Sequence, residues 1–193
     1  MEKIIDYIVS FLNFEKKFSE EEIETLRYGI EMILLKGVFF VCIVVIGTLF
    51  RKTVEIIFIW LFFRILRSNA GGYHSKTRMN CFVHSMLSFV IIIIVLSISY
   101  YFVSIKKIIF ILGIISSIYI WIIAPVDQLN REVTNVDKII FKKKSRFLVV
   151  VYNVLSLFFL FWKNYTLTNC IMIAIILTAK LLYQAKHCHK GFA

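Results

Sequence analysis

The sequence predicts an all-α fold: a polytopic integral membrane protein of about six membrane helices, one of them short or re-entrant, preceded by an N-terminal amphipathic interfacial helix. The 193-residue chain is 60% hydrophobic and 18% charged, whereas about half of a soluble domain is apolar. Its mean hydropathy is +0.81. With only 7 Gly and 1 Pro, it holds little material for long loops or linkers. We therefore expect a single domain over residues 1–193.

Long apolar runs are the main basis of this prediction. The run from Phe82 to Val103 reaches about 33 Å at about 1.5 Å per residue, enough for a hydrocarbon core of about 30 Å. The run from Val54 to Leu66 contains Glu55 and Arg64 and reaches only about 20 Å, so it is the short or half-inserted one. The other runs suited to spanning helices are Met32 to Phe50, Ile108 to Val126, Phe147 to Trp162 and Tyr165 to Leu182.

The formal net charge of +11 has two readings, a nucleic-acid footprint or retention of Lys and Arg on the cytoplasmic side of a membrane. Beside long apolar runs we favour the second, and we expect no nucleic-acid partner. If all six runs cross from a cytoplasmic N-terminus, most of the 23 Lys and Arg residues fall in inside segments. A re-entrant first pair of runs leaves the orientation unchanged. Residues 67–81, the basic stretch 142–146 and both termini are then cytosolic.

The residues before the first long run predict the start of a helix. Apolar residues recur at helical spacing over residues 1–18, as in an interfacial helix. Ser19 can then cap the next helix, and Glu22 can reach back as its capping-box partner. On that helix Arg27 and Glu31 share one polar face, four residues apart.

The segment from Arg67 to Cys81 is an unusual polar insertion between two apolar runs. Gly71 and Gly72 break the preceding helix and allow the backbone to approach a ligand closely. Thr77 or Asn80 can cap the following helix, which places Cys81 in its first turns at the membrane surface. Aligned N–H groups there favour a thiolate, as do the nearby basic residues Lys76 and Arg78.

Cysteine proteolysis needs a thiolate nucleophile, a base that takes and returns its proton, and donors for the oxyanion. Cys81 and His74 supply the first two residue types. On one straight helix they would lie about 10.5 Å apart along the axis, so the Gly-Gly loop must fold His74 back. His84 is a rival base, because its spacing of three residues places it beside Cys81. The spacing alone leaves this choice open, and both residue types also occur as ordinary buried or interfacial groups.

The sequence resembles the accessory gene regulator B (AgrB) family of quorum-sensing, peptide-processing membrane endopeptidases. The resemblance covers most of the chain in order and length, as one membrane peptidase domain. The matching elements are Arg67, Ala70-Gly71-Gly72, His74 and, after six intervening residues, Cys81, together with Arg27-Tyr-Gly-Ile-Glu31, Ala124-Pro125-Val126 and the lysine cluster that follows.

The resemblance implies that Cys81 is the nucleophile and His74 the general base and acid. It gives Arg67 and Gly72 supporting roles in shaping the site or gripping the substrate. Glu31 is a candidate for orienting His74 or the leaving group, although pairing with Arg27 explains this glutamate equally well.

The resemblance also implies the substrate, an AgrD-like propeptide. Cys81 attacks a peptide bond, releases the C-terminal tail and holds the remainder as a thioester, which a cysteine or serine of the precursor closes into a thiolactone or lactone. It further implies a homodimer in the bacterial cell membrane, with its active site at the cytoplasmic face. Excluding water protects such a thioester from hydrolysis.

A basic cluster is the candidate binding site for an acidic tail of the precursor. Retention of positive charge on the inner side explains the same residues equally well. The cluster consists of Lys142, Lys143, Lys144 and Arg146. We expect no cofactor and no metal, because three consecutive residues such as His187-Cys188-His189 cannot all face one ion from a helix.

Two functions from other classes compete with the peptidase. The first is a small membrane transporter or exporter of peptides without proteolytic activity, since Glu31, Arg64 and His84 are polar groups near membrane depth. The sequence shows no inverted repeat that would support transport. The second is a membrane scaffold without enzymatic activity.

Overall fold

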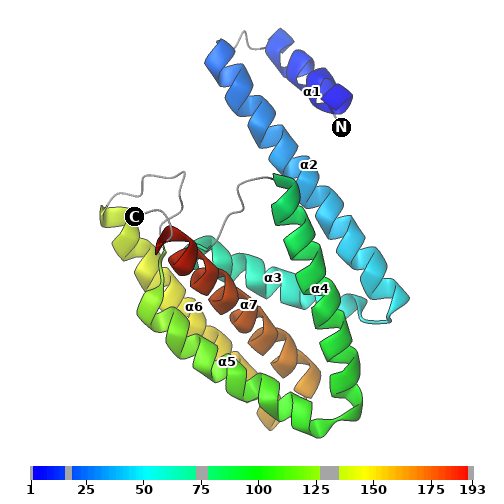
Figure 1. Cartoon of the computed structure of the whole chain (residues 1–193), viewed down its shortest axis with the longest axis vertical. Helices are drawn as coiled ribbons and strands as arrows, with labels where there is room; N and C mark the ends of the chain where they lie inside the picture. Colours follow the sequence, from blue (N-terminus) through cyan, green and yellow to red (C-terminus); the bar gives the residue numbers. More distant parts are fainter. Residues whose placement is uncertain (1, 16–18, 73–77, 127–134, 191–193) are drawn as a thin grey trace. The chain divides into compact units, whose positions relative to one another are not determined.

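The computed structural model describes residues 2–15, 19–72, 78–126 and 135–190. These residues form helices joined by short connections, in the chain order of Figure 1. The all-α polytopic fold predicted from the sequence is confirmed. The helices are α1 (Glu2–Glu15), α2 (Glu20–Leu49), α3 (Thr53–Ala70), α4 (Arg78–Tyr101), α5 (Val103–Ile123), α6 (Asn135–Phe161) and α7 (Tyr165–Lys190).

Five of these helices, α2 and α4 to α7, are long and apolar enough to cross a membrane. The short run expected at Val54 to Leu66 is α3, which lies outside this set. Its Glu55, Arg64 and Arg67 are costly to place in hydrocarbon. The helix expected at the N-terminus is α1.

Two compact units make up the chain, residues 1–45 and residues 46–193. In the first unit, Arg27 of α2 forms an ion pair with Asp6 of α1, and Ile5 is buried. The predicted capping box is present, because the N–H of Ser19 donates to a Glu22 carboxylate oxygen at 2.9 Å and the N–H of Glu22 donates to Ser19 Oγ at 3.4 Å.

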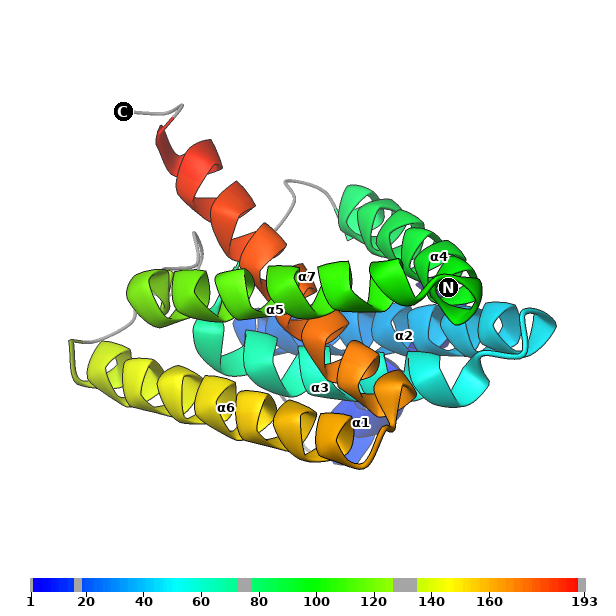
Figure 2. The same ribbon diagram turned by 90° about the horizontal axis from the view of Figure 1, so that it is seen from below.

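The second unit is built around α7. This helix packs against α3, α5 and α6, and Figure 2 shows it running diagonally across α5 and α3. All residues from Thr168 to Ile175 are buried. Gly113 of α5 allows the closest approach, since a Cβ there would lie 2.3 Å from the sulfur of Met172. Small residues at such crossings let two membrane helices pack closely.

The core of the second unit is mostly apolar, but it also holds hydrogen-bonded polar side chains, and large apolar side chains cover the outside as expected of a bundle in lipid. Asn153 of α6 donates to Ser117 Oγ of α5 at 2.9 Å, and the Tyr152 hydroxyl donates to the carbonyl of Phe62 in α3 at 3.0 Å. On the opposite face of α5, four exposed isoleucines follow a helical spacing: Ile111, Ile115, Ile118 and Ile122.

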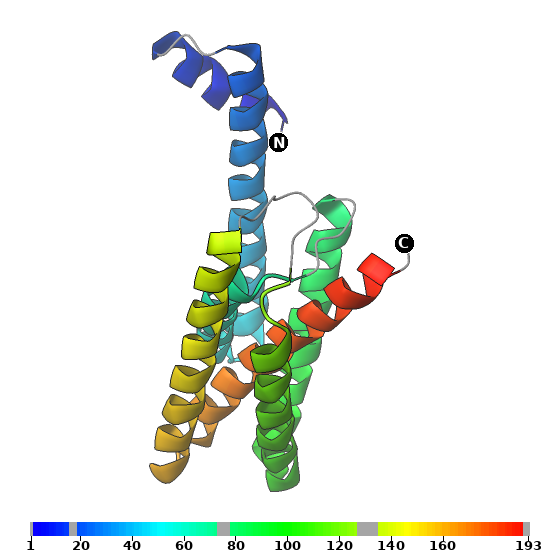
Figure 3. The same cartoon turned by 90° about the vertical axis from the view of Figure 1, so that its left-hand side faces the viewer.

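The ends of the second unit differ in character. The α4–α5 and α6–α7 turns lie at one end, and the first residues of α4 and α6 lie at the other (Figure 3). At the first end Lys52 pairs with Glu55 at 3.2 Å, and Lys106 lies over the ring of Tyr165. The predicted site residues of this unit belong to the second end.

Candidate active site

The end of α3 is joined to the end of α5 through the backbone. Gly71 forms a parallel bridge with Val126, and the N–H of Val126 donates to the carbonyl of Ala70 at 3.2 Å. Gly71 has φ +81, and a Cβ there would lie 2.4 Å from the carbonyl oxygen of Val126. Only glycine fits this position without strain. The helix break predicted from Gly71 and Gly72 is confirmed, since α3 ends at Ala70.

The next residue brings α7 into the same site. Gly72 is buried with φ +143, and a Cβ there would lie 3.3 Å from Cβ of Leu181. The two glycines therefore fix the chain just before residues 73–77, between the end of α5 on one side and α7 on the other.

Cys81 lies in the first turns of α4, partly exposed. Arg67, in the last turn of α3, is its neighbour: the guanidinium interacts electrostatically with the thiol and lies over the ring of Phe63, 5.7 Å from its centroid. Burial lowers the pKa of Arg67, and the neighbouring Cys81 partly opposes that shift. A guanidinium nonetheless keeps its charge at physiological pH. A fixed cation therefore stands beside the candidate nucleophile.

The structure describes one of the two candidate bases. His74 lies outside the described residues, so its role as general base stays a prediction. His84 is exposed, one turn after Cys81 on α4, and its backbone carbonyl accepts a hydrogen bond from the Ser88 hydroxyl at 2.9 Å.

The basic residues predicted to bind substrate fall into two groups. Lys142, Lys143 and Lys144 are exposed near the start of α6. Arg146 is engaged with α5: its Nε donates to the carbonyl of Trp121 at 3.2 Å, and its guanidinium lies over the Trp121 ring. The three lysines therefore remain open to a partner, while the arginine ties two helices together.

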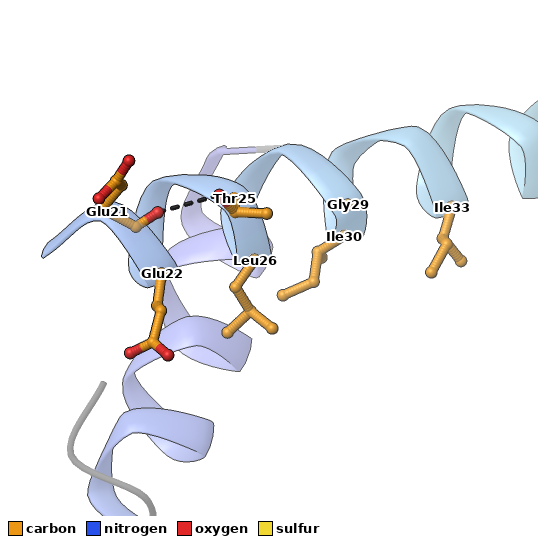
Figure 4. A pocket seen from close by; sticks show the side chains of 7 residues that line it. All are labelled: Glu21, Glu22, Thr25, Leu26, Gly29, Ile30 and Ile33. Atoms are coloured by element: carbon orange, nitrogen blue, oxygen red, sulfur yellow. Dashed lines mark hydrogen bonds between the residues drawn. The ribbon is translucent and has the colours of Figure 1, made fainter. Parts of the chain in front are cut away.

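Glu31 belongs to the first unit, where it is half-buried on α2. Its alternative partner Arg27 pairs with Asp6 instead. A shallow hollow runs along the same helix. Figure 4 shows its lining residues Leu26, Ile30 and Ile33 pointing to one side of α2. The hollow contains none of the predicted site residues.

The family of this chain follows from its similarity to known proteins. A model of the family "Accessory gene regulator B" matches residues 1–182, almost the whole chain. This chain belongs to the AgrB family.

Relatives of this AgrB chain include two proteins of Clostridium perfringens. A "Putative AgrB-like protein" of strain SM101 is 24% identical over 92% of this chain and 86% of its own length. A "Putative AgrB-like protein 2" of strain 13 is 23% identical over 91% and 86%. A "Putative AgrB-like protein" of Clostridium acetobutylicum is 32% identical over 47% of this chain. No solved structure matches.

Some neighbours of the AgrB site were not predicted from the sequence. Leu181 is one apolar residue among many in α7, and no pattern distinguishes it. The pairing of Gly71 with Val126 had a signal, because Ala70-Gly71-Gly72 and Ala124-Pro125-Val126 both carried the family resemblance. The contact between Arg67 and Cys81 is likewise an outcome of the fold, which brings the ends of α3 and α4 together.

We expect Gly71→Ala to destabilise the protein by about 2–4 kcal/mol, because positive φ and a clash with a backbone carbonyl act together. The melting temperature in detergent, followed by size-exclusion chromatography after heating, measures this. Ser68→Ala is the matched control, since Ser68 is exposed and its hydrogen bonds are local: it donates to the carbonyl of Ile65 and accepts from the Asn69 amide. Equal melting temperatures for the two variants would contradict the requirement for glycine at position 71.

Proposed function

We propose that this AgrB chain, acting as one domain over residues 1–193, is a membrane-embedded cysteine endopeptidase. It cleaves the C-terminal tail from an AgrD-like propeptide and promotes closure of a thiolactone or lactone for quorum sensing. The observation that carries the proposal is the meeting of Arg67 and Cys81 beside the fixed Gly71–Gly72 backbone. Reactive cysteines sit in such electropositive, partly exposed surroundings.

The first half of the reaction forms an acyl-enzyme. His74 takes the thiol proton of Cys81, and the sulfur attacks the carbonyl carbon of the scissile peptide bond. The carbon–nitrogen bond breaks, and His74 returns the proton to the leaving amine of the tail. The remainder of the precursor is then a thioester of Cys81.

The second half exchanges one acyl bond for another without net oxidation or reduction. A cysteine thiol of the precursor attacks the thioester carbonyl, and its proton passes through His74 to the departing sulfur of Cys81. The products are a thiolactone and the free enzyme, while a serine in the precursor gives a lactone. The lipid-facing surroundings of α4 limit the water that would hydrolyse the thioester.

The supporting residues keep the roles that the resemblance implies. Gly72 shapes the backbone just before His74 in the sequence, and Glu31 orients His74 or the leaving group. We also propose that the working form is a homodimer in the bacterial cell membrane. The Cys81 end faces the cytosol, because it is also the end near which Lys142, Lys143 and Lys144 are exposed.

We expect Cys81→Ala and His74→Ala each to reduce cleavage by about a thousandfold or more, because each removes a group that takes part in bond making. Co-expression with an AgrD-like propeptide, followed by mass spectrometry of the products, measures the loss. His84→Ala is the control on the same helix and should retain cleavage. Full cleavage by Cys81→Ala would overturn Cys81 as the nucleophile. Transport of intact peptide by the wild type, without cleavage, would support an exporter instead.

We expect Arg67→Gln to slow alkylation of Cys81 by iodoacetamide at neutral pH by about tenfold, because a charge-assisted contact is lost. Arg67→Lys should recover part of the rate. Arg64→Gln is the control: Arg64 is exposed one turn earlier and lies over the ring of Trp60. An unchanged alkylation rate for Arg67→Gln would show that the guanidinium does not increase the reactivity of the Cys81 sulfur.

We expect joint replacement of Lys142, Lys143 and Lys144 by glutamine to raise KM for the propeptide by about tenfold and leave kcat unchanged. Each exposed ion pair contributes about 0.5 kcal/mol, and uniform binding affects KM alone. Lys107→Gln, exposed on α5 near the other end of the bundle, is the control. An unaltered KM with normal topology would leave the cluster as a topological signal only.

A further inference from the structure

Lys180 is a charged residue inside a helix that is apolar enough to cross a membrane. It lies in the span Tyr165–His187 of α7, and its side chain reaches across to α4, where Nζ donates to Ser88 Oγ at 3.4 Å. Lys180 is exposed, and a charged residue within a spanning helix often marks a functional site.

Snorkelling along the helix axis does not explain the contact with Ser88. The apolar run ends at Leu182, two residues further toward the C-terminus. Side chains lean toward the N-terminus of their helix, which for Lys180 is the opposite direction. The hydrogen bond to Ser88 carries the ammonium group sideways, toward the helix of Cys81.

Ser88 links Lys180 to the candidate active site. Cys81, His84 and Ser88 lie at spacings of three, four and seven residues on α4, so all three share one face. The serine hydroxyl donates to the carbonyl of His84 at 2.9 Å and offers its oxygen to Lys180. Ser88 therefore positions the ammonium group about 10.5 Å along the axis from Cys81.

Lys180 has donors to spare within the second unit. An ammonium group has three N–H donors, and Ser88 takes one of them. The ion pairs of Arg27 with Asp6 and of Lys52 with Glu55 do not involve Lys180. The site thus consists of a cation with open donors on the face that Cys81 occupies.

We propose that Lys180, positioned by Ser88, binds a carboxylate of the peptide substrate about three residues from the scissile bond. The separation follows from the helix rise of about 10.5 Å between Cys81 and Ser88 and from about 3.5 Å per residue of an extended peptide. This inference rests on the proposed function and adds a specificity-determining subsite to it. The peptide carboxylate brings a counter-ion to Lys180, so an acidic substrate binds better than its neutral analogue.

Two affinity labels of Cys81 test the subsite without a known precursor. N-bromoacetyl-triglycine places a carboxylate about 10 Å from its reactive carbon, and N-bromoacetyl-triglycine amide has the same length without the charge. The full chain in membranes is treated with each label, and modification of Cys81 is followed by peptide mapping. We expect the wild type to react at least about tenfold faster with the acid than with the amide.

The variants separate a subsite from a structural role. Lys180→Gln should remove the preference for the acid and leave the rate with the amide unchanged, while Lys180→Arg should keep the preference and Ser88→Ala should weaken it. Lys186→Gln is the control, because Lys186 is exposed on the same helix. Iodoacetate, whose carboxylate is too close to the reactive carbon, should react equally with the wild type and Lys180→Gln.

Equal rates for acid and amide in the wild type would overturn the subsite and leave Cys81 as the nucleophile of the proposed function. A preference that persists in Lys180→Gln would overturn it as well, and would assign the charge effect to Arg67. If neither label modifies Cys81 while both modify a model thiol, the proposed nucleophile and the subsite fall together.

Discussion

The pairing of the α3 end with the α5 end, without a side chain between them, is the constraint on which the second unit depends. The bridge from Gly71 to Val126 leaves no room for a Cβ. It fixes the backbone immediately before residues 73–77, and it holds the end of α3 at the place where Arg67 reaches Cys81. A candidate site needs such a rigid support, because catalytic groups must be held within fractions of an ångström.

The bilayer explains the rest of the packing. Helices in lipid gain little from burying apolar side chains, so close packing and hydrogen bonds between helices hold them together. The contact of Gly113 with Met172 is of the first kind, and the bond from Asn153 to Ser117 is of the second. Both lie within a set of helices whose outer faces remain apolar.

Much of this fold could be predicted from the sequence, because each spanning helix contains a long apolar run. The capping box at Ser19 and Glu22 and the helix break at Gly71 are local patterns, and both were readable. The contact of Arg67 with Cys81 and the bond of Lys180 to Ser88 were not, since they join residues that are close only after α3, α4 and α7 have packed. The base at His74 rests on family resemblance, as spacing alone does not choose between it and His84.

The burial of Thr168 and Asn169 within α7 has a consequence for biogenesis. Exposed to lipid by itself, this helix would have to hold an amide and a hydroxyl in hydrocarbon, whereas inside the unit it meets α3, α5 and α6. The ribosome makes those three helices first. When α7 is synthesised, the helices that cover its polar residues are therefore already made. In a chain with α7 moved to the front, Thr168 and Asn169 would lack these neighbours during insertion.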